Sequence, residues 1–422
     1  MNTHEKYKRF MITEFLSEVD PVAVESAQGV TVVAEDGRRY LDAFAGISVC
    51  NAGHGCPEVL EAARRQTERL VHCGTYLHPN APAADLAELL AAITPGRLSK
   101  TFFGNGGAEA NEAAIRLAKQ ATGRTEFIAL QGSFHGRSLA TLSLSGMAGR
   151  KRGGGPYMPG VAFAPAPYCY RCPLELRHPA CNLACARAVE GLIATATSGA
   201  VAAMILEPIQ GEGGIVVPPP GYLRTVKEIL DRHQALLIVD EVQTGFGRTG
   251  WMFAVEAEEI EPDLMTLGKG IANGLPLSAL ITRPEIAAAF RPGDHLSTFG
   301  GNPVCCAAAI ATIGFHRHHN LAHAAREKGD AFLKDLRRRL SANPRVGEVR
   351  GRGLMIGVEL VHDASGAPSP DLARHVRAAC RDHGVLIGVG GLHGNVLRLQ
   401  PPLVISDEQL RLVADAVGKS LS

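Results

Sequence analysis

Short apolar runs alternate with longer helical patterns through the middle of the chain. The runs are predicted to be buried strands and lie at Glu126–Leu130, Val201–Pro208, Ala235–Glu241 and Ser278–Arg283. Between them, segments such as Gly221–Gln234 repeat apolar residues every three or four positions, which predicts amphipathic helices. Because the strands are apolar at successive positions, we expect an α/β fold whose mostly parallel sheet is covered by helices on both faces.

The two ends of the chain have a different pattern. Val30–Phe44 resembles a hairpin with an Asp36-Gly37 turn, and strands are expected within Arg352–Val361 and Asn395–Ser406. The sequence therefore predicts a large domain from residues 56–312 and a smaller α+β domain from residues 1–55 and 313–422.

Composition narrows the functional classes. The chain has 422 residues, is 46% hydrophobic and carries a formal net charge of +1, which gives no reason to expect nucleic acid or an anionic membrane as partner. The N-terminus has charges where a signal peptide is apolar, and no stretch approaches the ~18 apolar residues of a membrane span. We expect a cytoplasmic protein whose ten cysteines are mostly thiols.

Asp240 and Glu241 follow directly on the apolar run Leu236–Val239. Ligands of parallel α/β sheets bind at the carboxyl ends of strands, where these two residues lie. A carboxylate in so apolar a position is costly unless it faces a fixed positive partner. Asp240 is therefore a candidate site residue; alternatively, it caps the next segment or pairs with Arg248.

Lys269 lies between Gly268 and Gly270, directly after the apolar run "LMTL". A lysine in an apolar turn acquires a depressed pKa, which suits Schiff-base chemistry. The alternative is a solvated loop lysine. The flanking glycines argue against it, because they let a bulky ligand approach the backbone.

Two glycine-containing segments complete a possible cofactor site. In Phe102–Gln120 a strand ends in glycines and a helix begins near Ala108, so that free N–H groups can bind a phosphate. In Gln131–Ser138, Phe134 is placed to cover a flat heteroaromatic ring and Arg137 to hold a carboxylate. A buried acid, an amine, a phosphate site and an aromatic plate together match pyridoxal 5'-phosphate (PLP).

In its motifs, the chain resembles the class III (ω-amino acid) PLP-dependent aminotransferases, particularly their 4-aminobutyrate and alanine–glyoxylate type 2 branches. The resemblance covers nearly the whole chain, from "GISVCNAGH" through "ILEPIQGEGG", "IVDEVQTGFGRTG", "LGKG" and "STFGGNP" to "RLQPPL". It implies the fold-type-I architecture of PLP-dependent transferases.

The resemblance assigns cofactor roles. Lys269 resembles the lysine that holds the aldehyde, and Asp240 the acid that faces the pyridine nitrogen. Gln243 resembles the donor to the ring oxygen and Phe134 the residue stacked on the ring, with His135 beside it.

Further residues are implied around the phosphate. Gly107 and Ala108 would supply N–H groups, and Thr298 resembles the residue that reaches the phosphate of the neighbouring subunit, which implies a homodimer with shared active sites. Glu207, in "LEP", resembles a glutamate near the cofactor. The family often has hydroxyl residues where this chain has Gly106-Gly107-Ala108. We therefore expect backbone N–H groups and Thr298 to contribute more to phosphate binding here.

Four residues bear on the substrate. By resemblance, Arg137 holds the distal carboxylate of 4-aminobutyrate-like substrates, and Arg398 binds the α-carboxylate of the 2-oxo acid. Glu212 resembles the glutamate that pairs with this arginine when an ω-amine occupies the site, which would avoid a buried unpaired charge. Ile47 is expected to shape the pocket wall. As alternatives, Arg398 forms a structural ion pair and Arg137 pairs with a surface acid.

The predicted activity is transfer of an amino group from an ω-amino acid to a 2-oxo acid, such as 2-oxoglutarate or pyruvate, by a ping-pong mechanism. Gly74–Asn80 also resembles the alanine–glyoxylate branch. Amino-acid racemases or epimerases, aminomutases and phospho-lyases share the fold and stay open as alternatives.

Four cysteines have no role in this chemistry. Cys169, Cys172, Cys181 and Cys185 form a C-x2-C-x8-C-x3-C pattern. Such a pattern suits tetrahedral zinc or, less well, an iron–sulfur cluster. Free thiols or one disulfide are the alternative, and no metal ligand is assigned among the site residues.

Overall fold

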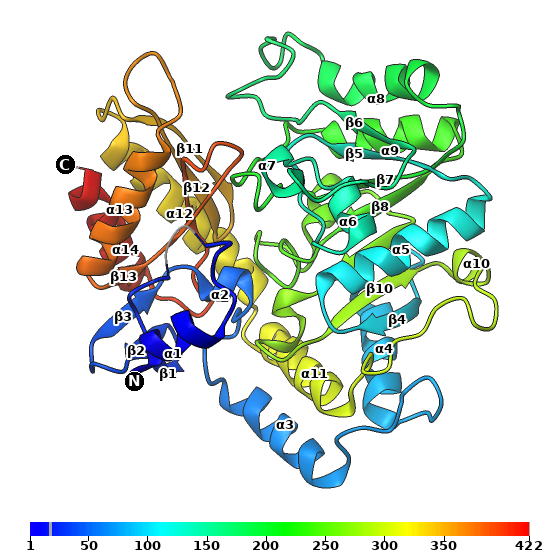
Figure 1. Cartoon of the computed structure of the whole chain (residues 1–422), viewed down its shortest axis with the longest axis horizontal. Helices are drawn as coiled ribbons and strands as arrows, with labels where there is room; N and C mark the ends of the chain where they lie inside the picture. Colours follow the sequence, from blue (N-terminus) through cyan, green and yellow to red (C-terminus); the bar gives the residue numbers. More distant parts are fainter. Residues whose placement is uncertain (17–18, 422) are drawn as a thin grey trace.

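The computed structural model describes residues 1–16 and 19–421. In these residues a seven-stranded sheet and two four-stranded sheets form two neighbouring parts of the molecule (Figure 1). The seven-stranded sheet and its helices lie on the right of the view, and the two smaller sheets lie on the left with both chain ends. No helix of the described residues is long and apolar enough to cross a membrane.

The seven-stranded sheet carries the candidate site. Its strands, in spatial order, are β4 (Lys100–Gly104), β10 (Ser278–Thr282), β9 (Leu264–Leu267), β8 (Leu236–Asp240), β7 (Val201–Leu206), β5 (Glu126–Leu130) and β6 (Val161–Ala164). β5 to β9 pair in parallel, whereas β10 is antiparallel to both of its neighbours. The connection from β9 to β10 is too short for a crossover helix, so β10 returns antiparallel. The expected α/β fold with a mostly parallel sheet is confirmed.

Alternate residues of the central strands pack into two different cores. In β8, Leu237 and Val239 belong to the core that includes α8 (Ala184–Thr195) and α9 (Tyr222–Arg232). Ile238 points to the opposite face, into the core formed with α5 (Gly107–Thr122). Because both faces are covered by apolar cores, successive strand positions are mostly apolar, and this is the pattern that predicted the sheet.

The predicted element ends differ from the structure by one or two residues. β7 ends before Glu207 and Pro208, and β8 ends at Asp240. Glu207 and Glu241 therefore lie in the loops that follow these strands. α9 begins after Gly221, whose left-handed φ of 82° is unsuited to a helix interior. These small shifts move Glu207 to the carboxyl edge of the sheet, where a ligand can reach it.

Further helices surround the large sheet or connect its strands. They are α3 (Pro57–Arg69), α4 (Ala81–Ile93), α6 (Leu139–Leu144), α7 (Ala148–Lys151), α10 (Pro284–Ala287), α11 (Pro303–His318) and the 3-10 turns η1 (Ala254–Glu258) and η2 (Lys269–Ala272). α11 packs against α3, α4 and η2. The helix that leads out of the large sheet therefore also supports the turn that carries Lys269.

Segments from both chain ends share the smaller sheets. One sheet has the order β1 (Val24–Gln28), β2 (Thr31–Ala34), β3 (Arg39–Asp42) and β13 (Val385–Leu386), and the other β11 (Val346–Arg352), β12 (Met355–Leu360), β15 (Val396–Leu399) and β14 (Gly388–Gly390). β2 and β3 form the expected hairpin, and β13 pairs in parallel with β3. α1 (Thr3–Phe10) and α2 (Ala45–Ser48) belong to the N-terminal segment, and α12 (Leu321–Leu340), α13 (Pro370–Asp382) and α14 (Asp407–Leu421) follow α11.

Arg248 ties the two parts of the molecule together. Its fully buried guanidinium donates to the carbonyl oxygens of Leu354 and Pro401 at 2.8 and 2.6 Å and to Oδ1 of Asn51 at 2.6 Å. Burial lowers the pKa of Arg248 to about 9. The alternative prediction that Arg248 pairs with Asp240 is wrong, because neutral oxygens from distant segments surround the guanidinium.

Glu241 holds the loop that follows β8. Its side chain is fully buried and accepts hydrogen bonds from the hydroxyl of Thr244 and, at 2.8 Å, from the amide of Val255. Burial raises its pKa from 4.5 to about 7. The second carboxylate at the end of the apolar strand is therefore a structural group that points away from the candidate site.

The raised pKa of Glu241 predicts a pH-dependent stability. Between pH 4.5 and about 7 the folded protein retains a proton that the unfolded chain has released, so stability falls as pH rises through this window. Glu241→Gln cannot titrate and should remove a contribution to this pH dependence on the order of 3 kcal/mol. Urea unfolding at several pH values would measure this, and parallel curves for the two proteins would contradict it.

Candidate active site

One cavity of about 180 Å³ gathers most of the predicted cofactor-binding residues. They line it together with Asn111, Gly136 and Val242, and are Gly107, Ala108, Phe134, His135, Glu207, Asp240, Gln243 and Lys269. The residues come from the ends of β5, β7, β8 and β9 and from the start of α5. The cavity therefore lies where ligands of α/β sheets bind, at the carboxyl ends of parallel strands.

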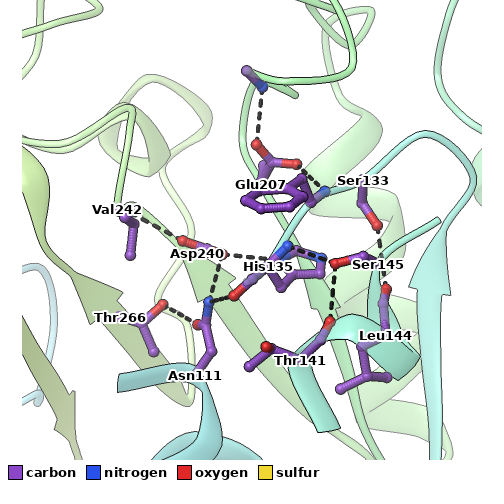
Figure 2. Close-up of polar contacts among 12 residues, drawn as sticks. Asn111, Ser133, His135, Thr141, Leu144, Ser145, Glu207, Asp240, Val242 and Thr266 are labelled. Atoms are coloured by element: carbon purple, nitrogen blue, oxygen red, sulfur yellow. Dashed lines mark hydrogen bonds and ion pairs between the residues drawn. The ribbon is translucent and has the colours of Figure 1, made fainter. Parts of the chain in front are cut away.

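Three polar groups contact the carboxylate of Asp240 (Figure 2). Its Oδ2 accepts from Nδ2 of Asn111 at 2.8 Å and lies 2.8 Å from Nδ1 of His135, while Oδ1 accepts from the amide of Val242 at 3.0 Å. Strand alternation explains the direction: Asp240 is two residues after Ile238, so both face α5, which carries Asn111. These hydrogen bonds give the buried carboxylate a fixed position.

Asn111 connects several elements at this point. Its Nδ2 also donates to the carbonyl oxygen of His135 at 2.8 Å, and its Oδ1 accepts from the hydroxyl of Thr266 at 2.6 Å (Figure 2). Thr266 lies directly opposite Asp240 in the pairing of β8 with β9. The sequence analysis did not identify Asn111 as a site residue. The feature that indicates it is a polar residue on the buried, alanine-rich face of α5, one turn after Gly107.

Lys269 begins the turn after β9 in a left-handed conformation with a φ of 42°, which is unusual for a side chain other than glycine. Burial lowers the pKa of its ammonium group, and the negative charges of Asp240 and Glu207 oppose that effect. The alternative of a solvated loop lysine is wrong, because Lys269 lines the cavity. A lysine with a lowered pKa is a better nucleophile at neutral pH.

Glu207 holds two backbone segments of the cavity wall. Its Oε1 accepts from the amide of Phe134 at 3.0 Å and its Oε2 from the amide of Gly211 at 2.9 Å (Figure 2). Burial raises its pKa to about 7, and the charge of Asp240 acts in the same direction. Glu207 thus fixes the loop that carries the aromatic ring.

The start of α5 presents an anion site. Within the described residues the amides of Gly107 and Ala108 donate no hydrogen bond, as expected for the first turn of a helix. A Cβ at Gly107 would lie 2.8 Å from Cγ1 of Val242, so glycine is required for this close approach. The predicted helix start is confirmed to within one residue, and its free amides suit a phosphate.

Gln243 is oriented by a partner that the sequence did not reveal. Its Oε1 accepts from Nε2 of Gln400 at 2.9 Å, which leaves the amide nitrogen of Gln243 free to donate toward the cavity. A Cβ at Gly211 would lie 2.2 Å from Oε1 of Gln243. The glycine after Gln210 therefore makes room for this side chain.

An ion-pair group lies beside the cavity. Nη1 of the buried Arg398 donates to Oε2 of Glu212 at 2.7 Å, and Nη2 of the more exposed Arg150 donates to Oε1 of the same carboxylate at 2.8 Å. A Cβ at Gly390 would lie 2.9 Å from Nε of Arg398, and the Arg398 guanidinium stacks over Phe44 at 5.1 Å. Burial alone would raise the pKa of Glu212, but the two arginines outweigh burial and lower it.

Besides Arg398 and Glu212, three further predicted site residues do not line the cavity. Thr298 is exposed in the loop before α11. Arg137 is exposed, its guanidinium lies 5.5 Å from the ring centre of Phe134, and it forms no ion pair within the described residues. Ile47 is 40% exposed in a left-handed conformation with a φ of 71°. Within a single chain, these residues stand outside the enclosed part of the site.

The four cysteines of the C-x2-C-x8-C-x3-C pattern, three in the loop before α8 and Cys185 in its first turn, line one narrow cavity together with His178. All of them, Cys169, Cys172, Cys181 and Cys185, are free thiols. Among the residues that the structure describes, no group of three or more His, Cys, Asp or Glu is arranged to hold a metal ion.

Comparisons with known proteins identify the family. Residues 16–421 match the model of the aminotransferase class-III family. The acetylornithine aminotransferase of Methanothermobacter thermautotrophicus is 40% identical, over 99% of this chain and 98% of its own length. The 4-aminobutyrate aminotransferase of Mycobacterium leprae is 40% identical, over 95% of this chain and 91% of its own.

A solved structure extends the similarity to the cofactor. An amine transaminase from an uncultivated Pseudomonas species, in its PLP-bound form, matches with a TM-score of 0.91 and 32% identity, over 95% of each chain. The described cavity fits this cofactor, because it offers free amides for a phosphate, a buried acid, an amide donor and an amine. The chain belongs to the class III aminotransferases, has their fold-type-I architecture and depends on PLP.

Proposed function

We propose that the protein transfers the amino group of an ω-amino acid, with 4-aminobutyrate-like donors first, to a 2-oxo acid such as 2-oxoglutarate or pyruvate. The ion pair between Arg398 and Glu212 carries this proposal. A buried arginine that can exchange an internal carboxylate for a substrate carboxylate suits an enzyme that binds both kinds of molecule in turn. Neutralising Arg398 with Glu212 avoids an unpaired buried charge while an ω-amine occupies the site.

The residues around the cavity have different roles in this reaction. When bound, PLP supplies an aldehyde for the amine and a ring that withdraws electrons from the adjacent carbon. The amine of Lys269 would hold the cofactor and would move the proton at the reacting carbon of the substrate. Asp240, fixed by Asn111 and His135, keeps the ring nitrogen protonated. The amides of Gly107 and Ala108 bind the phosphate.

The remaining predicted residues contact the substrate or the cofactor ring. Arg137 holds the distal carboxylate of an ω-amino acid, and its exposure leaves the guanidinium free for this role. Gln243 donates to the ring oxygen and Phe134 stacks on the ring. Ile47 contributes to the pocket wall once the site is closed by a second subunit.

Incubation of the holoenzyme with 4-aminobutyrate and 2-oxoglutarate should produce glutamate. N-acetylornithine is the parallel donor to compare, because acetylornithine aminotransferases are as similar as 4-aminobutyrate aminotransferases. Faster turnover of N-acetylornithine would reassign the donor. Inversion of an amino acid without any oxo acid would indicate a racemase, and release of phosphate from a phosphorylated amine a phospho-lyase; either would refute the proposal.

Replacing Asp240 tests the assigned charge. Asp240→Asn retains the shape of the side chain but removes the counter-charge of the ring nitrogen, so the cofactor should remain bound while turnover falls by orders of magnitude. Glu241→Gln is a matched control, since the neighbouring acid points away from the cavity. Stopped-flow absorbance of the amine half-reaction measures both variants. A near-normal rate in Asp240→Asn would show that the carboxylate has another function.

A homodimer with shared active sites is part of the proposal. The segments around Val71 and Phe299 lie side by side, since Nδ2 of Asn302 donates to the carbonyl oxygen of Val71 at 2.9 Å. They expose large apolar side chains: Val71 is 52% exposed, Leu77 72%, Leu296 59% and Phe299 61%. Thr298 lies within this apolar surface, which suits contact with a second copy.

Phe299→Glu tests the dimer. A charge placed in this apolar surface should raise the dimer dissociation constant at least about tenfold and weaken PLP binding, because Thr298 could no longer reach the other subunit's phosphate. Sedimentation velocity with and without PLP provides the measurement. Leu412→Glu on α14 is a control, since Leu412 is 53% exposed but belongs to another surface. An unchanged dimer in Phe299→Glu would place the interface elsewhere.

A further inference from the structure

Two arginines converge on a single carboxylate next to the active site. Glu212 uses one oxygen for the buried Arg398 and the other for Arg150, whose side chain is 39% exposed. Neither sequence motif nor family resemblance assigned a role to Arg150. The group carries two positive charges and one negative charge, so it has room for one further anion.

Hydrogen bonds hold the backbone at and after Glu212. The carbonyl oxygen of Glu212 accepts from the amide of Gly391 at 3.0 Å. The next loop residues are held as well, since Nη2 of Arg350 donates to the carbonyl oxygen of Gly214 at 2.6 Å. A substrate that displaces Glu212 from Arg398 therefore rotates a side chain without remodelling the loop.

Arg150 stands on a short but anchored helix. The neighbouring Lys151 donates from Nζ to the carbonyl oxygens of Ser143 and Ser145 at 3.1 and 3.2 Å. The Lys151 ammonium also lies 4.5 Å from the ring centre of Phe163. The C-terminal end of α7 is thus held in place, while the long, partly exposed side chain of Arg150 can follow a moving carboxylate.

We propose that Arg150 is a specificity-determining positioning residue, which takes over the Glu212 carboxylate when the α-carboxylate of glutamate or 2-oxoglutarate displaces it from Arg398. This inference rests on the exchange at Arg398 that the proposed function assumes. With Arg150 present, two arginines serve two carboxylates. Without it, the displaced Glu212 has no cation of its own and lies close to a second negative charge.

The charge balance fixes the direction of the effect. An ω-amine leaves Glu212 on Arg398 and gains nothing from Arg150, whereas an α-carboxylate needs the second cation. Arg150→Gln should therefore raise the KM for glutamate about three- to tenfold, with kcat nearly unchanged, and leave the KM for a simple amine unaltered. Arg150→Lys, which retains the charge, should recover much of the loss.

A binding measurement separates this role from a general structural one. Isothermal titration of the holoenzyme with glutarate, an unreactive dicarboxylate, should show a three- to tenfold weaker dissociation constant in Arg150→Gln. Arg152→Gln, which changes the neighbouring exposed arginine, is the matched control and should bind like the parent. In a Glu212→Gln background, Arg150→Gln should have no further effect, because no displaced carboxylate needs a partner.

Three results would overturn the proposal: equal losses for glutamate and the simple amine, tighter binding of glutarate in Arg150→Gln, or a full effect of Arg150→Gln in the Glu212→Gln background. Tighter binding would mean that Arg150 holds Glu212 on Arg398. Failure of the proposed function is distinguishable, because a parent enzyme that rejects every ω-amine would still allow the glutamate and glutarate comparison between the variants.

Discussion

The active site depends on keeping one negative charge in an apolar environment. Asp240 ends a strand whose side chains at 237–239 are buried among hydrocarbon groups, and such a carboxylate is stable only when donors hold it. Asn111, His135 and the amide of Val242 provide that support from three different segments. The position of the charge therefore requires the whole central sheet and α5 to be assembled, which couples the chemistry to the fold.

A second constraint is the balance of charges around Lys269. Burial lowers the pKa of the lysine, whereas Asp240 and Glu207 favour its charged form. Beside the same cavity, Arg398 and Glu212 form an ion pair within the chain. Lys269 and Arg398 thus both lie near carboxylates of the same chain.

Sequence reasoning found the fold and most of the cavity because the relevant residues stand at predictable places. Asp240 ends a strand, Lys269 and Glu207 follow strands, and Gly107 begins a helix, so periodicity and glycine placement indicate them. Asn111 and Gln400 could not be predicted as site residues, because their partners are distant in the chain: Asn111 and Asp240 are 129 residues apart. Strand ends were misplaced by one or two residues, because apolar periodicity does not reveal where backbone pairing stops. The exposure of Thr298, Arg137 and Ile47 in a single chain was equally invisible in the sequence.

The central claim is that one cavity binds PLP through Lys269 above the carboxylate of Asp240. Borohydride reduction of the holoenzyme, followed by proteolysis and mass spectrometry, tests it most directly. The account predicts a phosphopyridoxyl group on Lys269 alone, at one per chain. A label on another lysine, or a protein that takes up no PLP at saturating concentration, would contradict it.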